Sequence, residues 1–134
     1  MATASIQQAV EKYSKGFSEL PRQCTRAAMS DRLRDLLAEL RRRFEALYGP
    51  RLAGLVLFGS QARGDAEPGS DIDVLVVLTG AVNPGDEISR TLSDVAELSL
   101  NNNVVFSCVF VSADRFGREQ SPLLINVRRE GVPL

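Results

Sequence analysis

One stretch decides the fold: residues 55–78 have the sequence LVLFGSQARGDAEPGSDIDVLVVL. Its first four residues are apolar and lead into Gly59 and Ser60, a pattern that predicts a buried strand, a tight turn and the start of a helix. Free N–H groups and the helix dipole at such a start favour an anion. The sequence therefore predicts a phosphate site at Gly59 and Ser60, and the apolar residues that follow the polar loop predict a second strand over residues 71–78.

Two acids open this second strand. Asp71 and Asp73 stand two residues apart, and side chains at that spacing in a strand share a face. Two carboxylates held so close repel each other unless a cation lies between them. Mg²⁺ binds carboxylate oxygens and keeps its remaining positions for water and substrate phosphates. We therefore expect a metal-binding acid pair beside the phosphate site, a combination suited to phosphoryl or nucleotidyl transfer.

The two halves of this stretch resemble a known family signature. GSQARG at residues 59–64 and SDIDVLV at residues 70–76 are similar to the GSxARG and SDxDxxV motifs of the DNA polymerase beta-like nucleotidyltransferases. The likeness is strongest to the stand-alone minimal nucleotidyltransferases of antitoxin type, many of which are encoded beside HEPN-type toxin ribonucleases. It runs from about residue 32 to residue 111 and continues weakly over residues 126–132. The implied fold is α/β (α+β), a nucleotidyltransferase fold with a mixed β-sheet flanked by helices.

The resemblance also implies roles for individual residues. Asp71 and Asp73 are expected to be catalytic and to hold Mg²⁺, which bridges the nucleoside triphosphate (NTP), with ATP the favoured substrate. The nucleotide-binding residues that it implies are Gly59, Ser60, Arg63 and Ser70. Two interpretations stay open for Arg63, which either contacts phosphate or forms a buried ion pair with Asp65 or Glu67. Ser70 suits a cap of the loop better than a contact with substrate.

The sequence departs from the family pattern on the third predicted strand, residues 104–111. Active relatives usually carry a third carboxylate there, which acts as the base for the incoming hydroxyl. This strand has none, and the nearest acids are Glu97 before it and Asp114 after it. Three explanations stay open: the acceptor needs no such base, another group supplies it, or the chain binds nucleotide without turning it over.

Composition limits the other possibilities. The chain has 134 residues, 44% of them hydrophobic and 25% charged, which predicts one globular domain. It contains no apolar run of about 18 residues, so we expect no membrane span, and its first residues do not have the pattern of an export signal. A cytoplasmic protein is therefore expected, with Cys24 and Cys108 reduced rather than joined. The absence of histidine excludes histidine-based catalysis and leaves the carboxylates to carry any chemistry.

Periodicity predicts the remaining elements. Helices are expected over residues 31–48 and 86–100, and a strand over residues 52–58. One face of the second helix is predicted to be marked by Ile88, Leu92, Val95, Ala96 and Ser99. Ser112 is expected to cap a short helix, and residues 122–130 have helical spacing. Residues 30–134 form the expected nucleotidyltransferase domain. Residues 1–29 are expected to form an N-terminal helical extension, for which a packed helix, a partner-binding arm and a disordered tail all stay open.

The functional hypothesis is a Mg²⁺-dependent nucleotidyltransferase that moves NMP from an NTP to a hydroxyl of a protein or small-molecule acceptor. A HEPN-type toxin is the partner that the resemblance implies. The rival is a catalytically impaired nucleotide-binding or partner-binding module, either an antitoxin or a regulatory subunit. Nucleic-acid binding through Arg41, Arg42 and Arg43 is the weakest option, because a solvated helix face is the commoner role of such a run.

Overall fold

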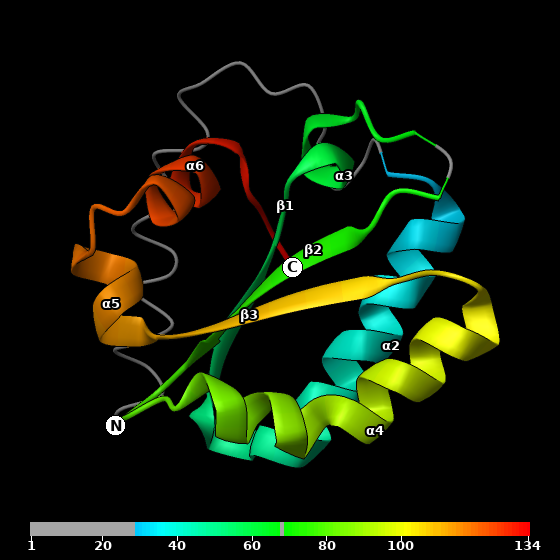
Figure 1. Ribbon diagram of the computed structural model, residues 1–134. Helices are drawn as coiled ribbons and strands as arrows, with labels where there is room; N and C mark the ends of the chain where they lie inside the picture. The colour runs from blue at the N-terminus through cyan, green and yellow to red at the C-terminus, as the bar shows by residue number, and fades with distance from the viewer. Residues whose placement is uncertain (1–28, 68) are drawn as a thin grey trace.

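The computed structural model describes residues 29–67 and 69–134 of the chain. The expected N-terminal helical extension therefore lies outside the described residues, except for Met29. The elements, shown in Figure 1, are α2 (Asp31–Tyr48), η2 (Gly49–Arg51), β1 (Leu52–Phe58), α3 (Ser60–Arg63), β2 (Ile72–Leu78), α4 (Pro84–Asn102), β3 (Phe106–Ser112), α5 (Ala113–Arg118), α6 (Pro122–Glu130) and β4 (Val132–Pro133).

The four strands form one mixed sheet with the order β3-β2-β1-β4. β1 runs antiparallel to β2 and to β4, whereas β2 and β3 are parallel and are joined through α4. This arrangement confirms the predicted mixed sheet flanked by helices. It also brings the end of β1 and the beginnings of β2 and β3 to one end of the sheet, where the 59–73 motif lies.

Helices cover both faces of the sheet and produce two separate cores (Figure 1). On one face, α2 and α4 contribute Leu40, Phe44 and Leu98 to a core that also contains Val74 and Val76. On the other face, α5 and α6 contribute Phe116, Leu124 and Val127, which pack against Leu75 and Val77. β2 is therefore buried on both sides beyond Asp73, as its continuous apolar run predicts.

α2 has the predicted bounds. The Ser30 hydroxyl accepts a hydrogen bond from the N–H group of Leu33, 3.1 Å away, which satisfies one free donor of the first turn. Gly49 ends the helix with a φ of 55°, a left-handed value that suits glycine. The buried apolar residues of the helix belong to the core, whereas Leu47 is 39% exposed; the buried residues are Leu36, Leu37, Leu40, Phe44 and Tyr48.

The predicted face of α4 is wrong at Ile88 and Leu92, whereas Val95 packs against the core. Ile88 and Leu92 are 52% and 61% exposed, whereas Glu87, Thr91 and Leu98 are the buried residues of this helix. Burial of Glu87 is possible because the Tyr48 hydroxyl donates to it over 2.9 Å and Arg90 pairs with it over 3.1 Å. The contact with Tyr48 of α2 therefore decides which face of α4 is buried. The apolar pattern could not predict this, because it does not show which polar side chains are hydrogen-bonded when they are buried.

Two strand boundaries also differ from expectation. β2 begins at Ile72 rather than Asp71, and β3 spans Phe106–Ser112 rather than residues 104–111. The pairing of the two strands sets these boundaries, because it runs from Ile72 opposite Phe106 to Leu78 opposite Ser112. β4 is not among the predicted strands, since two residues that include a proline have no strand pattern of their own. Within residues 29–67 and 69–134, no helix combines the length and apolar character needed to cross a bilayer.

Candidate phosphate and metal site

The Gly59-Ser60 bend joins β1 to the single turn of α3. The Gly59 carbonyl accepts hydrogen bonds from the N–H groups of Ala62 and Arg63, 3.1 and 3.0 Å away. The N–H groups of Ser60 and Gln61 belong to the first turn, which has no preceding helical carbonyl to bind them. The predicted turn is therefore present, and it presents backbone donors at the end of the sheet.

Gly59 lies directly against the carboxylate of Asp73. A Cβ atom placed on Gly59 would collide with Oδ2 of Asp73 and would lie 3.2 Å from its Cγ. Gly59 also has a φ of 74°, which residues with a side chain rarely adopt. The pairing of Phe58 with Asp73 across β1 and β2 produces this proximity. The structure thus brings the bend and one of the two predicted acids into a single site.

The two acids differ in their surroundings. Asp73 is half-buried at the start of β2, whereas Asp71 is exposed in the preceding loop rather than inside the strand. Burial raises the pKa of Asp73, the negative charge of Asp71 raises it further, and Arg63 acts in the opposite direction. The three charged groups therefore influence one another, and the pair has the mutual repulsion that a bound cation would relieve.

Arg63 forms an ion pair, as one of its two open interpretations predicts. Its Nε atom lies 3.2 Å from Asp65, and its Nη1 atom lies 3.2 Å from Glu130 at the end of α6. The side chain is half-exposed, so the predicted burial of this pair is wrong. The sequence-based expectation does not include Glu130, because a contact between residues 67 positions apart leaves no local pattern. The ion pairs hold the guanidinium beside the acids, where it also stays within reach of solvent.

Ser70 caps the loop between the two motifs. Its hydroxyl accepts a hydrogen bond from the N–H group of Glu67, 3.0 Å away, and its own N–H group donates to the Glu67 carbonyl over the same distance. These bonds match the loop-cap interpretation and fix the chain just before Asp71.

The position beside Asp73 on the third strand is Ser107. Parallel neighbours in register point to the same face of a sheet, so the side chain that shares the face of Asp73 on this strand is a serine and not a carboxylate. The nearest acids in the sequence lie elsewhere, because Glu97 pairs with Arg43 at 3.2 Å and Asp114 pairs with Arg118 at 3.1 Å. The structure therefore places none of these acids beside Asp73 on β3, which agrees with the difference from the family pattern seen in the sequence.

The donor set fits Mg²⁺ with substrate present. Among the described residues, no group of three or more carboxylate, thiol or imidazole side chains is arranged to hold a metal. Mg²⁺ nevertheless needs only one or two protein carboxylates when phosphate oxygens and water complete its shell. Asp71 and Asp73 meet this requirement.

The basic run on α2 is balanced by acids. Arg41 pairs with Glu45 at 2.7 Å, Arg42 pairs with Glu39, and Arg43 contacts Asp94 and Glu97 at 3.2 Å. These contacts match the interpretation of the run as a solvated helix face rather than a patch for nucleic acid.

The comparisons with known proteins agree with this geometry. Residues 37–110 match the family model described as the nucleotidyltransferase domain. A search of curated proteins found no match. The matched region begins in α2 and ends in β3, and it includes the bend, the loop and both acids.

Proposed function

The chain belongs to the nucleotidyltransferase domain family, and from this premise we propose that it transfers NMP from an NTP, in a Mg²⁺-dependent reaction, to a hydroxyl group. One observation carries the proposal: the Asp73 carboxylate lies against Gly59. A metal ion on the acids and phosphates on the bend can therefore belong to the same bound NTP.

Each residue of the site has a distinct proposed role. Gly59 allows the backbone to approach phosphate, because it has no side chain. Ser60 donates its hydroxyl and N–H group to phosphate oxygens, and Arg63 offsets their negative charge. Asp71 and Asp73 would hold Mg²⁺, which supplies charge neutralisation at the α-phosphate when it is bound. Ser70 contributes indirectly, since its loop bonds position Asp71.

We propose ATP as the substrate, and a partner protein or a small molecule as the acceptor. The described helices pack on both faces of the sheet, so we place the acceptor on a separate molecule. A HEPN-type toxin is the partner that the resemblance to antitoxin-type relatives suggests. The setting that we propose is the cytoplasm, where NTP is available.

The experiment incubates the full chain with α-³²P-labelled NTPs and Mg²⁺, with and without the product of an adjacent gene. Asp71→Asn and Asp73→Asn should abolish label transfer, because each removes a carboxylate from the proposed pair. Asp86→Asn is the control, since Asp86 is an exposed acid in the first turn of α4, away from the motif. Transfer that survives in both site variants would contradict the proposal.

The second candidate is a module that binds NTP without turnover, as an antitoxin or a regulatory subunit. Ser107, rather than a carboxylate, beside Asp73 on β3 favours it. This candidate predicts Mg²⁺-dependent NTP binding that Asp73→Asn weakens, with no label transfer to any acceptor. Calorimetry in parallel with the labelling assay separates the two candidates.

A further inference from the structure

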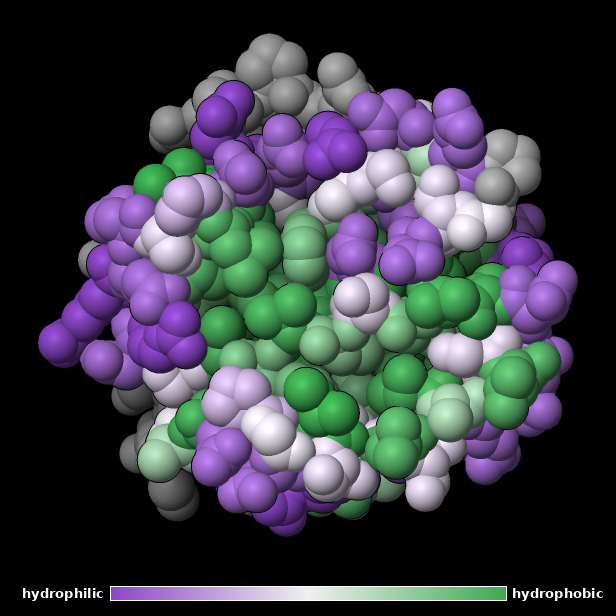
Figure 2. Space-filling model, viewed as in Figure 1, coloured by the Kyte–Doolittle hydropathy of each residue, from purple (hydrophilic) through white to green (hydrophobic). Residues whose placement is uncertain are grey.

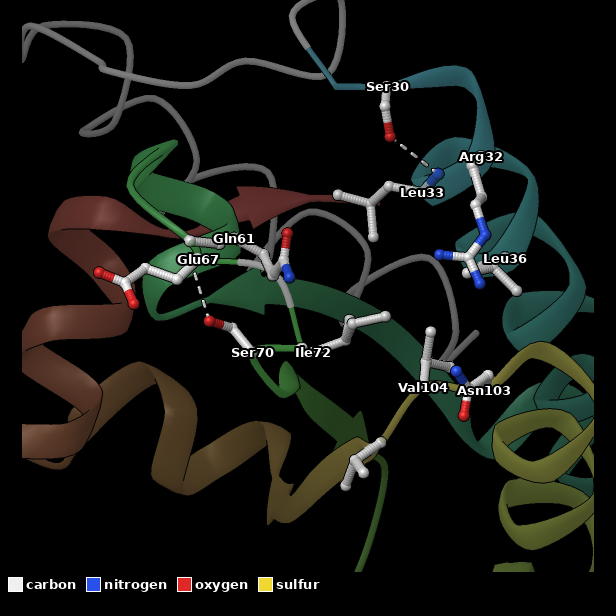
Figure 3. Close-up of a pocket in the computed structure, with 13 residues that line it drawn as sticks. Ser30, Arg32, Leu33, Leu36, Gln61, Glu67, Ser70, Ile72, Asn103 and Val104 are labelled. Carbon is white, nitrogen blue, oxygen red and sulfur yellow. Dashed lines mark hydrogen bonds between the residues drawn. The ribbon is translucent and has the colours of Figure 1, made fainter.

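A cavity of about 640 Å³ lies beside the proposed phosphate and metal site. Figure 3 shows Gln61 and Ile72 facing it from α3 and the start of β2, with Leu33 and Val104 on the opposite side. We propose that this cavity binds the nucleoside part of the NTP. The inference rests on the proposed function and extends it by assigning the place of the base and sugar.

The chemistry of the walls suits a nucleobase. Leu33, Leu36 and Ile72 provide aliphatic surface, and Gln61 and Asn103 provide side-chain amides. A base has flat apolar faces and a rim of hydrogen-bond donors and acceptors, and an amide offers both a donor and an acceptor. Ligand pockets of roughly 300–1,000 Å³ commonly combine apolar walls with a few such polar groups.

The position of the cavity suits a group that is bonded to the α-phosphate. Gln61 directly follows Ser60, and Ser70, which also lines the cavity, directly precedes Asp71. The cavity therefore begins one residue away from the proposed phosphate contact and one residue away from the proposed metal ligand. The nucleoside is bonded to the α-phosphate, whose charge Mg²⁺ on Asp71 and Asp73 would neutralise, so it must lie close to the metal end of the site.

The same position disfavours the acceptor as the occupant. In nucleotidyl transfer the attacking and leaving oxygens are roughly in line, so the acceptor approaches from the side opposite the leaving pyrophosphate. With the pyrophosphate on the Gly59-Ser60 bend, the acceptor approaches from the side away from the bend. Gln61 lines the cavity and directly follows Ser60, so the cavity adjoins the bend, and we assign it to the nucleoside rather than to the acceptor.

One side-chain hydrogen bond and the backbone conformation hold the walls of the cavity in place. Arg32, on the rim, donates to the carbonyl of Asn102 and so ties the beginning of α2 to the end of α4. Asn103 ends α4 in a left-handed conformation with a φ of 54°. The Val105 carbonyl accepts a hydrogen bond from the N–H group of Ile72 over 2.8 Å. A preformed pocket of this kind loses little entropy when it binds its ligand.

The experiment places a larger side chain at the cavity and leaves Asp71 and Asp73 unchanged. Val105 lines the cavity, yet its side chain is 55% exposed, so Val105→Trp adds bulk there without entering the core. Leu100→Trp is the matched control, because Leu100 is an exposed aliphatic residue outside the lining. Calorimetry measures binding of the magnesium complexes of ATP, GTP, CTP and UTP, and of magnesium tripolyphosphate, which has no nucleoside.

We expect Val105→Trp to weaken the tightest-binding NTP at least tenfold while tripolyphosphate affinity stays unchanged. Leu100→Trp should change neither affinity. Asn103→Gly, which tolerates the left-handed conformation and removes the amide, should weaken the NTP several-fold and leave tripolyphosphate unaffected.

Three results would overturn the inference. Unchanged NTP affinity in Val105→Trp would place the nucleoside elsewhere and leave the proposed function standing. Equal weakening of NTP and tripolyphosphate would show damage to the phosphate site rather than loss of a nucleoside pocket. Failure of the wild-type chain to bind either compound would overturn the proposed function together with this inference.

Discussion

Gly59 has a left-handed backbone conformation and also lies against the Asp73 carboxylate. Mutation can separate the effect of the backbone conformation from the effect of this contact. Gly59→Ala should destabilise the fold by about 1–3 kcal/mol through backbone strain, and it should also displace the Asp73 carboxylate. We therefore expect NTP affinity to fall at least tenfold, as measured by calorimetry. Gly80→Ala is the control, because Gly80 has a φ of 77° and nothing within 4 Å of an added Cβ. Equal NTP affinities in the two variants would contradict the role given to Gly59.

Asp73 links stability to pH. Its pKa is raised above the ordinary value of 3.8, first by burial and then by the charge of Asp71, so the folded state opposes its ionisation. The stability that depends on protonated Asp73 is present below pH 3.8 and is lost as the pH rises through the folded-state pKa. Asp73→Asn should therefore be more stable than the wild type at pH 7 without metal, and the difference should vanish near pH 3. Urea unfolding between pH 3 and pH 7 measures it, and a difference that stays constant with pH would contradict the expectation.

At the scale of elements, the contact between α2 and α4 depends on one buried acid. Glu87 is 3% exposed and accepts a hydrogen bond from the Tyr48 hydroxyl. Tyr48→Phe should lower the free energy of unfolding by about 1.5–3 kcal/mol, because it removes a hydrogen bond to a charged group. Urea unfolding checks this value. NTP affinity should stay unchanged, and a large loss of affinity would show that the contact also supports the site.

The parallel register of β2 and β3 predicts a gain of function. Ser107 pairs with Asp73, so Ser107→Asp should place a third carboxylate on the same face. Mg²⁺ affinity, measured by calorimetry in the presence of a non-hydrolysable NTP, should rise about tenfold, because an additional anionic ligand strengthens binding of a hard cation. Ser107→Asn is the control for size without charge. Equal effects of the two substitutions would contradict the register-based assignment.

Local patterns account for the elements that the sequence predicts correctly. The bounds of α2 and the core of the sheet follow from the capping serine and from continuous apolar runs, both of which are properties of neighbouring residues. The inward face of α4 could not be predicted in this way, since burial of Glu87 depends on Tyr48, 39 positions earlier. Likewise, the bend and the acids of the site lie within 15 residues, but the Glu130 partner of Arg63 comes from the far end of the chain.

At the scale of the whole molecule, the two edges of the sheet differ in the strand that forms them. The edge beyond β1 is closed by β4, where Val132 is buried and the N–H group of Leu134 donates to the Leu55 carbonyl over 2.9 Å. The opposite edge is β3, and Figure 2 shows hydrophobic residues gathered over this part of the molecule. Exposed edges with apolar surroundings are the usual sites of unwanted strand pairing.

Deletion of residues 132–134 should therefore leave β1 as well as β3 at an edge of the sheet that residues 29–67 and 69–134 form. It removes the buried Val132 and the backbone bonds to β1, so we expect a loss of stability of about 2 kcal/mol or more. We also expect association that increases with protein concentration. Urea unfolding and light scattering measure the two effects. A monomeric variant of unchanged stability would show that β4 contributes nothing to the fold.

Arg63 pairs with both Asp65 and Glu130, and this arrangement links ligand binding at the bend to the C-terminal helix. A phosphate oxygen that recruits this guanidinium competes with Glu130, which lies at the end of α6. A ligand at the bend would then loosen the anchorage of the last helix, even though it never touches that helix. Amide hydrogens of α6 should accordingly exchange faster with deuterated solvent when the NTP is bound, so that the C-terminal segment becomes a remote indicator of binding.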